Sequence, residues 1–285
     1  DEVPQKSLVM SCFQSPKKAK RKVVNNGPKG KVGMSASEVS SPGQELPAIQ
    51  MLVLNYNRML EENIEKFKET FFRAVKLNGL EVVKILSQLV MRKNIPLGSE
   101  IMREPESSAS VLHVALLYNH FDIIEYLVNL RDPDLIMAVY TTEEYKNQST
   151  LHVAVANGNI RIVEMILKSL QPKDRRFLMN SIADGTYFQK QHPSGQLCLT
   201  AAAWSGNGDM LCLLAKYGVN FKERNLKGNT VLHGIILSMH DSHDLEMHQQ
   251  MIDKIFEAVG IWAKHCKYKA TIEGHVQLEQ KEKQI

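Results

Sequence analysis

One stretch decides the fold of this chain: STLHVAVANGNIRIVEMIL, residues 149–167. Its pattern returns as SVLHVALLYNHFDIIEYLV from Ser110 and as TVLHGIILSM from Thr230. Two further copies have weaker starts, namely FFRAVKLNGLEVVKIL from Phe71 and LCLTAAAWSGNGDMLCLLAKYGVN from Leu197. Each full copy predicts a short helix, a turn at Asn or Gly, and a second helix with an apolar stripe.

The spacing of these copies identifies the repeat type. The equivalent turn positions are expected at Gly79, Asn119, Gly158, Gly206 and Met239, which lie 40, 39, 48 and 33 residues apart. A unit of about 33 residues is the ankyrin period, so the surplus residues belong to loops between repeats. We therefore predict an all-α ankyrin-repeat solenoid of helix-turn-helix units with long finger loops, and we expect function in those loops.

The predicted helices are too short to be stable alone, because isolated helices below about 12–15 residues are marginal in water. Stacking must supply the stability. Ser110, Ser149 and Thr230 precede the first helices and are expected to cap them. Small side chains should let repeats approach closely, while one leucine per repeat fills the space between them. The alanines are Ala115, Ala154, Ala201 and Ala202, and the leucines are Leu112, Leu151, Leu199 and Leu232.

Patterns that would indicate catalysis or metal binding are weak. His113, His152 and His233 recur once per repeat, so they cannot share one ion, and we interpret them as structural hydrogen-bonding residues. A second histidine group, made of His240, His243 and His248, lies in a polar stretch without matching cysteines or carboxylates. The glycines of NGPKGKVG lack the spacing of a phosphate loop, and no GxSxG occurs. We predict no enzyme activity, no cofactor and no metal.

The domain organisation follows from composition. Residues 1–45 are rich in Ser, Pro, Gly and Lys and are interpreted as a disordered tail. Residues 46–266 are assigned to about five repeats, led in by one or two helices that begin near Leu46, and residues 267–285 to a charged C-terminal segment. The repeats are centred on residues 71–90, 110–130, 149–169, 197–220 and 228–260.

Charge is concentrated in the tail. Residues 1–50 contain eight Lys/Arg and four Asp/Glu, which leaves 27 of each sign in residues 51–285. The repeat region is therefore neutral and lacks the basic footprint of a nucleic-acid binder. The tail carries the basic cluster Lys17, Lys18, Lys20, Arg21 and Lys22. Three interpretations stay open for this cluster: a solvated run without a specific role, nuclear import, or contact with acidic lipid or protein.

Two further features describe the expected surroundings of the chain. No run approaches the roughly 20 apolar residues that span a bilayer, and the chain begins at Asp1, so we expect an excised soluble piece without a transmembrane segment. The four cysteines, Cys12, Cys198, Cys212 and Cys266, show no CxxC spacing and are interpreted as free thiols in a reducing, intracellular setting.

Three stretches also resemble the cytosolic ankyrin domain of the vanilloid subfamily of transient receptor potential channels (TRPV-like). EEYKNQSTLHVAVANGN from Glu143 is similar to the start of that family's third repeat. GTYFQKQHPSGQLCLTAAA from Gly185 resembles its YFGEHPLSFAA region, with Gln189, Lys190 and Gln191 in place of Gly-Glu and about four extra residues after Pro193. GNTVLH from Gly228 matches the start of its fifth repeat, and the resemblance covers about residues 60–260.

The resemblance implies regulators of the nucleotide and calmodulin type. Tyr145 and Gln148 match the aromatic residue and the Gln with which some members of the family bind nucleotide. The lysine positions of that site align with Ala109 and Val114. A polyphosphate would lose charge-assisted bonds worth about 1.5–3 kcal/mol each. The sequence therefore argues against nucleotide binding.

By this resemblance, the chain is the protein-interaction module of a cation channel, acting in subunit assembly and in regulation of ion transport at the cytosolic face of the plasma membrane. Its partners would be neighbouring subunits or other cytosolic proteins. The expected contact residues are Tyr145, Gln148, Tyr187, Phe188 and His192. Tyr187, Phe188 and His192 on the longest finger could equally pack that finger against its own repeat. The alternative is a free ankyrin adaptor that the basic tail directs to the nucleus.

Overall fold

The computed structural model of this chain describes residues 42–190, 193–233 and 249–264, together with residues 236, 246 and 266. Helices dominate this part of the chain, and its only β-type pairing outside helices is an isolated bridge between Val139 and Ser149. The predicted all-α repeat solenoid is confirmed.

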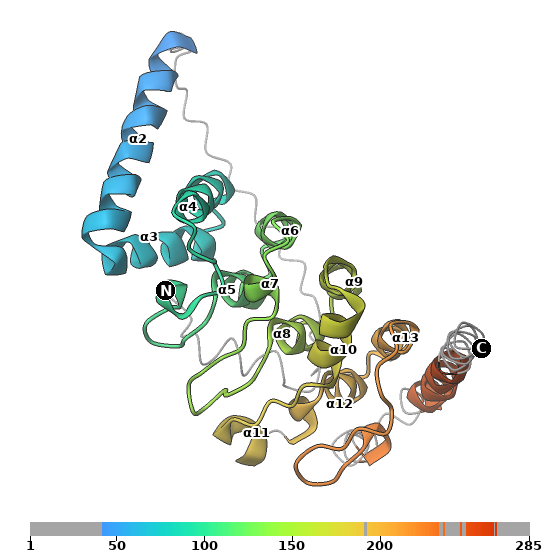
Figure 1. Ribbon diagram of the computed structural model, residues 1–285. Coiled ribbons are helices and arrows are strands. Elements are labelled where there is room, and N and C mark those ends of the chain that lie inside the picture. The colour runs from blue at the N-terminus through green and yellow to red at the C-terminus, as the bar shows by residue number, and fades with distance from the viewer. Residues whose placement is uncertain are drawn as a thin grey trace, which may run out of the picture.

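Four helix pairs form two rows that run side by side through the molecule (Figure 1). The inner row contains α3 (Ile64–Lys76), α5 (Val111–Leu117), α8 (Thr150–Ala156) and α12 (Cys198–Trp204). The outer row contains α4 (Leu80–Arg92), α6 (Phe121–Asn129), α9 (Ile160–Ser169) and α13 (Gly208–Lys216). A fifth pair is represented by the helical residues 231–233 and 249–264. Each repeat packs on the next, so the core is continuous along the stack.

The inner helices show why stacking is required. All seven residues of α5 are buried, and in α8 only Ala156 is not. A helix of seven residues could not persist alone in water, since its roughly two turns leave most backbone groups without an intrahelical partner. Packing between two neighbouring repeats stabilises these short helices, which would otherwise unfold.

Capping side chains start these helices as predicted. The Ser110 Oγ accepts a bond from the backbone N–H of His113, and the His113 Nδ1 accepts one from the backbone N–H of Ser110, both at 3.3 Å. Ser149 and His152 repeat this capping box in α8. The predicted structural role of both histidines is confirmed. The side chains of Thr230 and His233 make the same contact at 3.0 Å, in an exposed position.

The turns between paired helices use a left-handed residue. Asn119, Gly158 and Gly206 have φ angles of 55°, 72° and 70°, which confirms these three positions. In the first repeat the residue is Asn78, with φ 58°, and the prediction of Gly79 was wrong by one position. Among non-glycine residues Asn is one of the most enriched in this conformation, and here it takes the turn position in place of the glycine that follows it. Gly79 is instead the N-cap of α4.

The inter-repeat leucines are confirmed in three repeats. Leu112, Leu151 and Leu199 are at most 4% exposed. The prediction for Leu232 was wrong, since 56% of this side chain is exposed. Within the described residues nothing packs over this side chain.

The lead-in to the stack is a long helix, α2 (Pro42–Glu62), which begins four residues before Leu46. It packs on α3 and α4 and projects beyond the rows (Figure 1). Leu60 is buried in this contact, whereas Met51 and Leu54 are about 60% exposed on the other side.

The remaining residues of the described repeats form four fingers: finger 1 (residues 93–110), finger 2 (130–149), finger 3 (170–197) and finger 4 (217–230). They contain the short elements η1 (Glu100–Met102), α7 (Pro133–Ile136), α10 (Pro172–Asn180), α11 (Thr186–Lys190) and η2 (Pro193–Gln196). Among the described helices, none is both long and apolar enough to cross a membrane.

Candidate functional site: the row of fingers

Fingers 1 and 2 are fixed to each other by backbone contacts at their roots. The Leu97 N–H donates to the Asp132 carboxylate at 2.9 Å. Gly98 lies so close to α7 that an added Cβ would sit 2.1 Å from the backbone of Asp134. Only glycine fits this approach.

Arg103 and Ser108 extend the contact between these two fingers. The Arg103 guanidinium donates to the Val139 carbonyl oxygen at 2.9 Å, and the Ser108 Oγ accepts from the Thr141 and Thr142 N–H groups at 2.8 and 3.2 Å. Burial lowers the pKa of Arg103, yet its carbonyl partners keep the cation hydrogen-bonded. Finger 2 therefore cannot move independently of finger 1 in this conformation.

Fingers 2 and 3 pair through their backbones. The Asp184 and Gly185 N–H groups donate to the Lys146 carbonyl oxygen at 3.1 and 3.2 Å. The Tyr187 N–H donates to Glu144 at 3.0 Å. A Cβ at Gly185 would lie 2.3 Å from the Glu144 carbonyl oxygen, so a side chain there would separate the two fingers.

An aromatic cluster fills the space beneath this contact. Ring centroids are 5.9 Å apart for Tyr140 and Tyr145, 5.5 Å for Tyr145 and Tyr187, and 5.2 Å for Tyr187 and Phe188. Phe188 is fully buried, and Tyr145 and Tyr187 are each 6% exposed. Burial, reinforced by Glu144, raises the pKa of Tyr145, so its hydroxyl stays protonated. The Tyr187–Phe188 pair is edge-on and the other two pairs are tilted, and favourable aromatic pairs add about 0.5–1.5 kcal/mol each beyond area burial.

The structure thus brings together four of the five predicted contact residues, but on the inside of the fingers. Tyr145, Gln148, Tyr187 and Phe188 are all buried, with Gln148 at 0% exposure. In this conformation they support the shape of fingers 2 and 3 from within. His192 lies outside the described residues, as does the basic cluster at residues 17–22.

Sequence reasoning missed the side chains that do face solvent on these two fingers. They are the exposed residues Glu143, Lys146, Asn147, Gln189 and Lys190. Lys146, Asn147 and Gln189 directly flank a buried aromatic or amide residue, and Glu143 and Lys190 lie two residues from one. That proximity was the available signal, because a charged or amide side chain near a buried ring is usually left in solvent.

Hydrogen bonds at buried groups continue the row toward finger 4. The His152 Nε2 contacts the Gln196 carbonyl oxygen at 3.0 Å, and the Gln196 Oε1 accepts from the Leu226 N–H at 3.2 Å. The Asn220 N–H donates to the Asn180 side chain at 3.1 Å. All four fingers are therefore linked in series to one another and to the inner helices.

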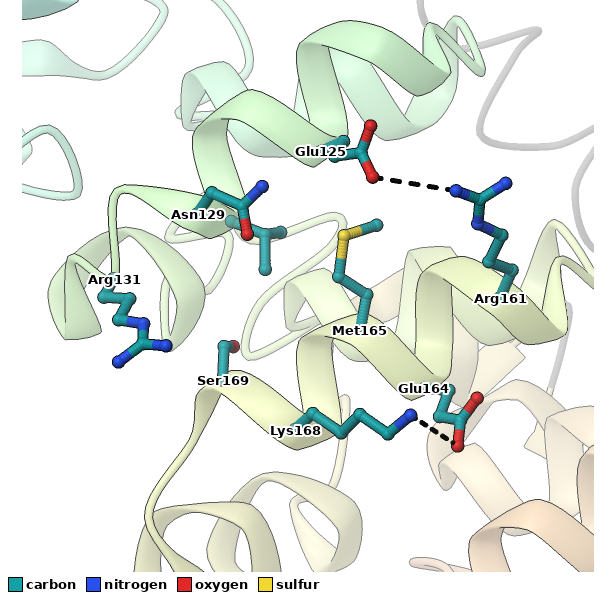
Figure 2. A pocket seen from close by; sticks show the side chains of 9 residues that line it. Glu125, Asn129, Arg131, Arg161, Glu164, Met165, Lys168 and Ser169 are labelled. Atoms are coloured by element: carbon teal, nitrogen blue, oxygen red, sulfur yellow. Dashed lines mark ion pairs between the residues drawn. The ribbon is translucent and has the colours of Figure 1, made fainter.

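The outer helices carry a hollow of about 450 Å³ between α6 and α9 (Figure 2). Its charges are largely paired, with Arg161 at 3.7 Å from Glu125 and Lys168 at 3.0 Å from Glu164. The lining residues are Glu125, Val128, Asn129, Arg131, Arg161, Glu164, Met165, Lys168 and Ser169. An open hollow lined by exposed ion pairs is better suited to contact with another protein than to catalysis.

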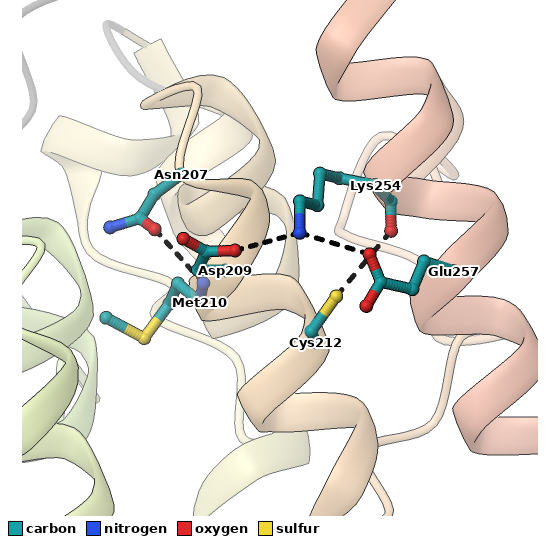
Figure 3. Close-up of polar contacts among 6 residues, drawn as sticks. All are labelled: Asn207, Asp209, Met210, Cys212, Lys254 and Glu257. Atoms are coloured by element: carbon teal, nitrogen blue, oxygen red, sulfur yellow. Dashed lines mark hydrogen bonds and ion pairs between the residues drawn. The ribbon is translucent and has the colours of Figure 1, made fainter.

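A second polar cluster joins the fourth repeat to the helical residues 249–264 (Figure 3). The Lys254 ammonium lies 3.0 Å from Asp209 and 3.1 Å from Glu257. Its aliphatic chain covers Gly208, where a Cβ would be 2.5 Å from the Lys254 Cγ. The Cys212 thiol contacts the Lys254 carbonyl oxygen at 3.8 Å, and partial burial raises its pKa. The thiol is therefore protonated at neutral pH, unlike an activated nucleophile.

Across the described part of the chain, no group of three or more His, Cys, Asp or Glu side chains is placed to hold a metal ion. Both buried histidines accept hydrogen bonds in helix caps. Burial lowers the pKa of His113 to about 3 and that of His152 to about 4. Because these imidazoles are neutral and hydrogen-bonded inside helix caps, their role is structural.

Comparison with known proteins agrees with this architecture. Residues 71–176 match the family model for ankyrin repeats in three copies. The chain is 26% identical over 185 residues to the dog transient receptor potential cation channel subfamily V member 1, which covers 59% of this chain and 21% of that protein. It is 29% identical over 147 residues to the human subfamily V member 6, covering 50% and 18%.

A third relative extends the match along the chain. The human subfamily V member 5 is 24% identical over 228 residues, which is 75% of this chain and 29% of that protein. The chain therefore spans less than a third of the length of each of these relatives. Neither ankyrin repeats nor these channels are enzymes in kind.

Proposed function

We propose that this ankyrin-repeat domain, which resembles the corresponding region of vanilloid-type transient receptor potential channels, is the cytosolic interaction module of such a cation channel. It would lie at the cytosolic face of the plasma membrane, where it contributes to subunit assembly and to regulation of ion transport. Its partners would be neighbouring subunits and other cytosolic proteins.

The single observation that carries the proposal is the linked row of fingers. Binding a protein surface costs the entropy of ordering the groups that meet, and a prefixed surface avoids much of that cost. Fingers 2 and 3 share backbone hydrogen bonds and a buried aromatic cluster, so their exposed side chains keep fixed relative positions. Ankyrin repeats in general present such surfaces to other proteins.

The residues predicted as contacts acquire a specific role in this proposal. Tyr145, Gln148, Tyr187 and Phe188 hold the fingers in shape, and the exposed residues around them meet the partner. His192 stays a predicted contact. Nucleotide binding is not proposed, since Gln148 is inaccessible and the family's lysine positions hold Ala109 and Val114.

Assembly is tested by co-precipitation of two differently tagged copies of the chain from cells. Lys146→Glu combined with Lys190→Glu reverses two exposed charges on fingers 2 and 3 and should lower the co-precipitated fraction, with unchanged helical content by circular dichroism. Lys216→Glu, at the exposed end of α13, is the matched control. Finger variants that co-precipitate like the control would contradict a role of fingers 2 and 3 in assembly.

The channel part of the proposal is tested separately. Sequencing of full-length transcripts should show coding sequence for membrane-spanning helices downstream of the Ile285 codon. A stop codon soon after that codon in every transcript would overturn the assignment to a channel.

A further inference from the structure

Finger 1 ends in a small acidic and apolar surface, here called the acidic tip and made of Glu100, Ile101 and Glu106. Ile101 is 57% exposed, and both glutamates are exposed beside it. The other charged groups of this finger have partners of their own. Glu104 pairs with Lys76 at 3.0 Å, and Arg103 donates to backbone carbonyl oxygens while its charge also interacts with that of Glu100.

Finger 4 ends in a surface of the opposite charge, the basic tip, made of Lys222, Arg224, Leu226 and Lys227. Leu226 is 56% exposed, and the three cations around it are exposed as well. The one acidic residue of this finger, Glu223, accepts a bond from the Asn220 side chain at 2.7 Å. In the described part of the chain, none of the charged residues of either tip has an ion-pair partner.

Hydrogen bonds to the backbone and the burial of a neighbouring residue hold both tips in place. In finger 4, the Asn225 N–H donates to the Asn229 carbonyl oxygen at 2.9 Å, and the Arg224 side chain donates to Gly228 at 2.9 Å. The Leu226 N–H is anchored on Gln196. In finger 1, η1 places Ile101 outward while its neighbour Met102 is fully buried. The two tips are thus preformed surfaces of complementary charge, each with an exposed aliphatic residue.

We infer that the acidic tip of one copy of this chain docks on the basic tip of a second copy. The tips lie on the first and last of the four fingers, so the contact is head-to-tail, and repetition of such a contact gives a closed ring or an open filament. The inference rests on the proposed role in assembly and names the surface and the partner. Each tip is small, and its charges are solvent-exposed, so the contact is weak and sensitive to salt.

Site-directed cross-linking tests the head-to-tail geometry in the full chain. In a Cys12→Ser, Cys266→Ser background, one chain carries Ile101→Cys and a second, of different tag, carries Leu226→Cys. Under mild oxidation at low salt, the mixture should form the mixed disulfide dimer about tenfold faster than either variant alone forms its own dimer. Equal rates in all three samples would overturn the inference.

Charge reversal distinguishes this contact from other modes of assembly. In the cross-linking pair, Glu100→Lys with Glu106→Lys on one chain, or Lys222→Glu with Lys227→Glu on the other, should each slow the mixed dimer by about tenfold, and both together should restore the rate. Lys173→Glu with Arg176→Glu, exposed on α10, is the control and should have no effect. If the chains self-associate and no tip reversal changes the rate, the tip contact is wrong while the assembly role stands.

Discussion

The buried capping histidines predict an acid sensitivity of defined size. His113 and His152 are both 0% exposed, and each Nδ1 accepts a bond from the backbone N–H of the capping serine. Burial, and then the charge of Arg103, lowers the pKa of His113 to about 3. Burial lowers the pKa of His152 to about 4. The ring of His113 also packs on Tyr140, with centroids 4.4 Å apart.

The sign follows from proton linkage. In the unfolded chain a histidine titrates near pH 6.5, whereas both native rings stay neutral down to about pH 4. Between these values the unfolded state binds protons that the native state does not, so the free energy of unfolding falls as the pH falls. The contribution of the two neutral histidines to the free energy of unfolding is fully present above about pH 6.5 and is lost progressively below it.

The magnitude is large for a domain of this kind. Each pH unit below 6.5 costs about 1.4 kcal/mol per histidine, so at pH 5 each ring costs about 2 kcal/mol and the two together cost about 4 kcal/mol. Folded domains are typically stable by about 5–15 kcal/mol. Most carboxylates titrate near pH 4, below this range, so the loss between pH 6.5 and 5 reports the histidines.

Urea unfolding followed by circular dichroism at pH 7, 6 and 5 measures this loss. His152→Gln should lower stability at every pH but reduce the steepness of the pH dependence by about one proton. His233→Gln is the matched control, since that ring makes the same contact with Thr230 but is exposed. Equal stability at pH 7 and 5, or NMR titration of the His113 and His152 rings near pH 6.5, would refute the reasoning.

Three further predictions concern packing in the fingers and repeats. Gly185→Ala should destabilise the domain by about 1–3 kcal/mol, because its Cβ would lie 2.3 Å from the backbone of finger 2. Gly260→Ala has open space around its Cβ and should stabilise the domain by up to about 1 kcal/mol. Thermal melting compares the two variants, and equal shifts in melting temperature would contradict the close contact at Gly185. Phe188→Ala should cost about 3–5 kcal/mol in urea unfolding, with exposed Gln189→Ala near neutral; a melting curve like wild type would mean that the ring is not core. Ser149→Ala should cost about 1 kcal/mol through loss of the cap, and an unchanged unfolding midpoint would contradict the capping box.

Local features of the stack were predictable because each depends on residues close in sequence. Helix starts follow from a capping hydroxyl and a histidine three residues later, as at Ser110 and Ser149. Left-handed turns need Gly or Asn, and within the described residues only the choice between Asn78 and Gly79 failed, since either residue satisfies the rule. The fifth predicted turn position, Met239, lies outside the described residues. The repeat period then fixed the fold class, because short helices of this pattern are stable only when stacked.

The sequence alone therefore determined that the chain is a stack of capped helix pairs with long insertions between them. Only the tertiary structure decided which finger residues face inward. Tyr187 and Phe188 are buried because finger 2, some 40 residues earlier in the chain, lies against Gly185 at backbone distance. Leu232 is exposed for the converse reason, since no described residue distant in sequence packs over it. Burial in a finger is set by neighbours distant in sequence, and a local pattern does not contain that information.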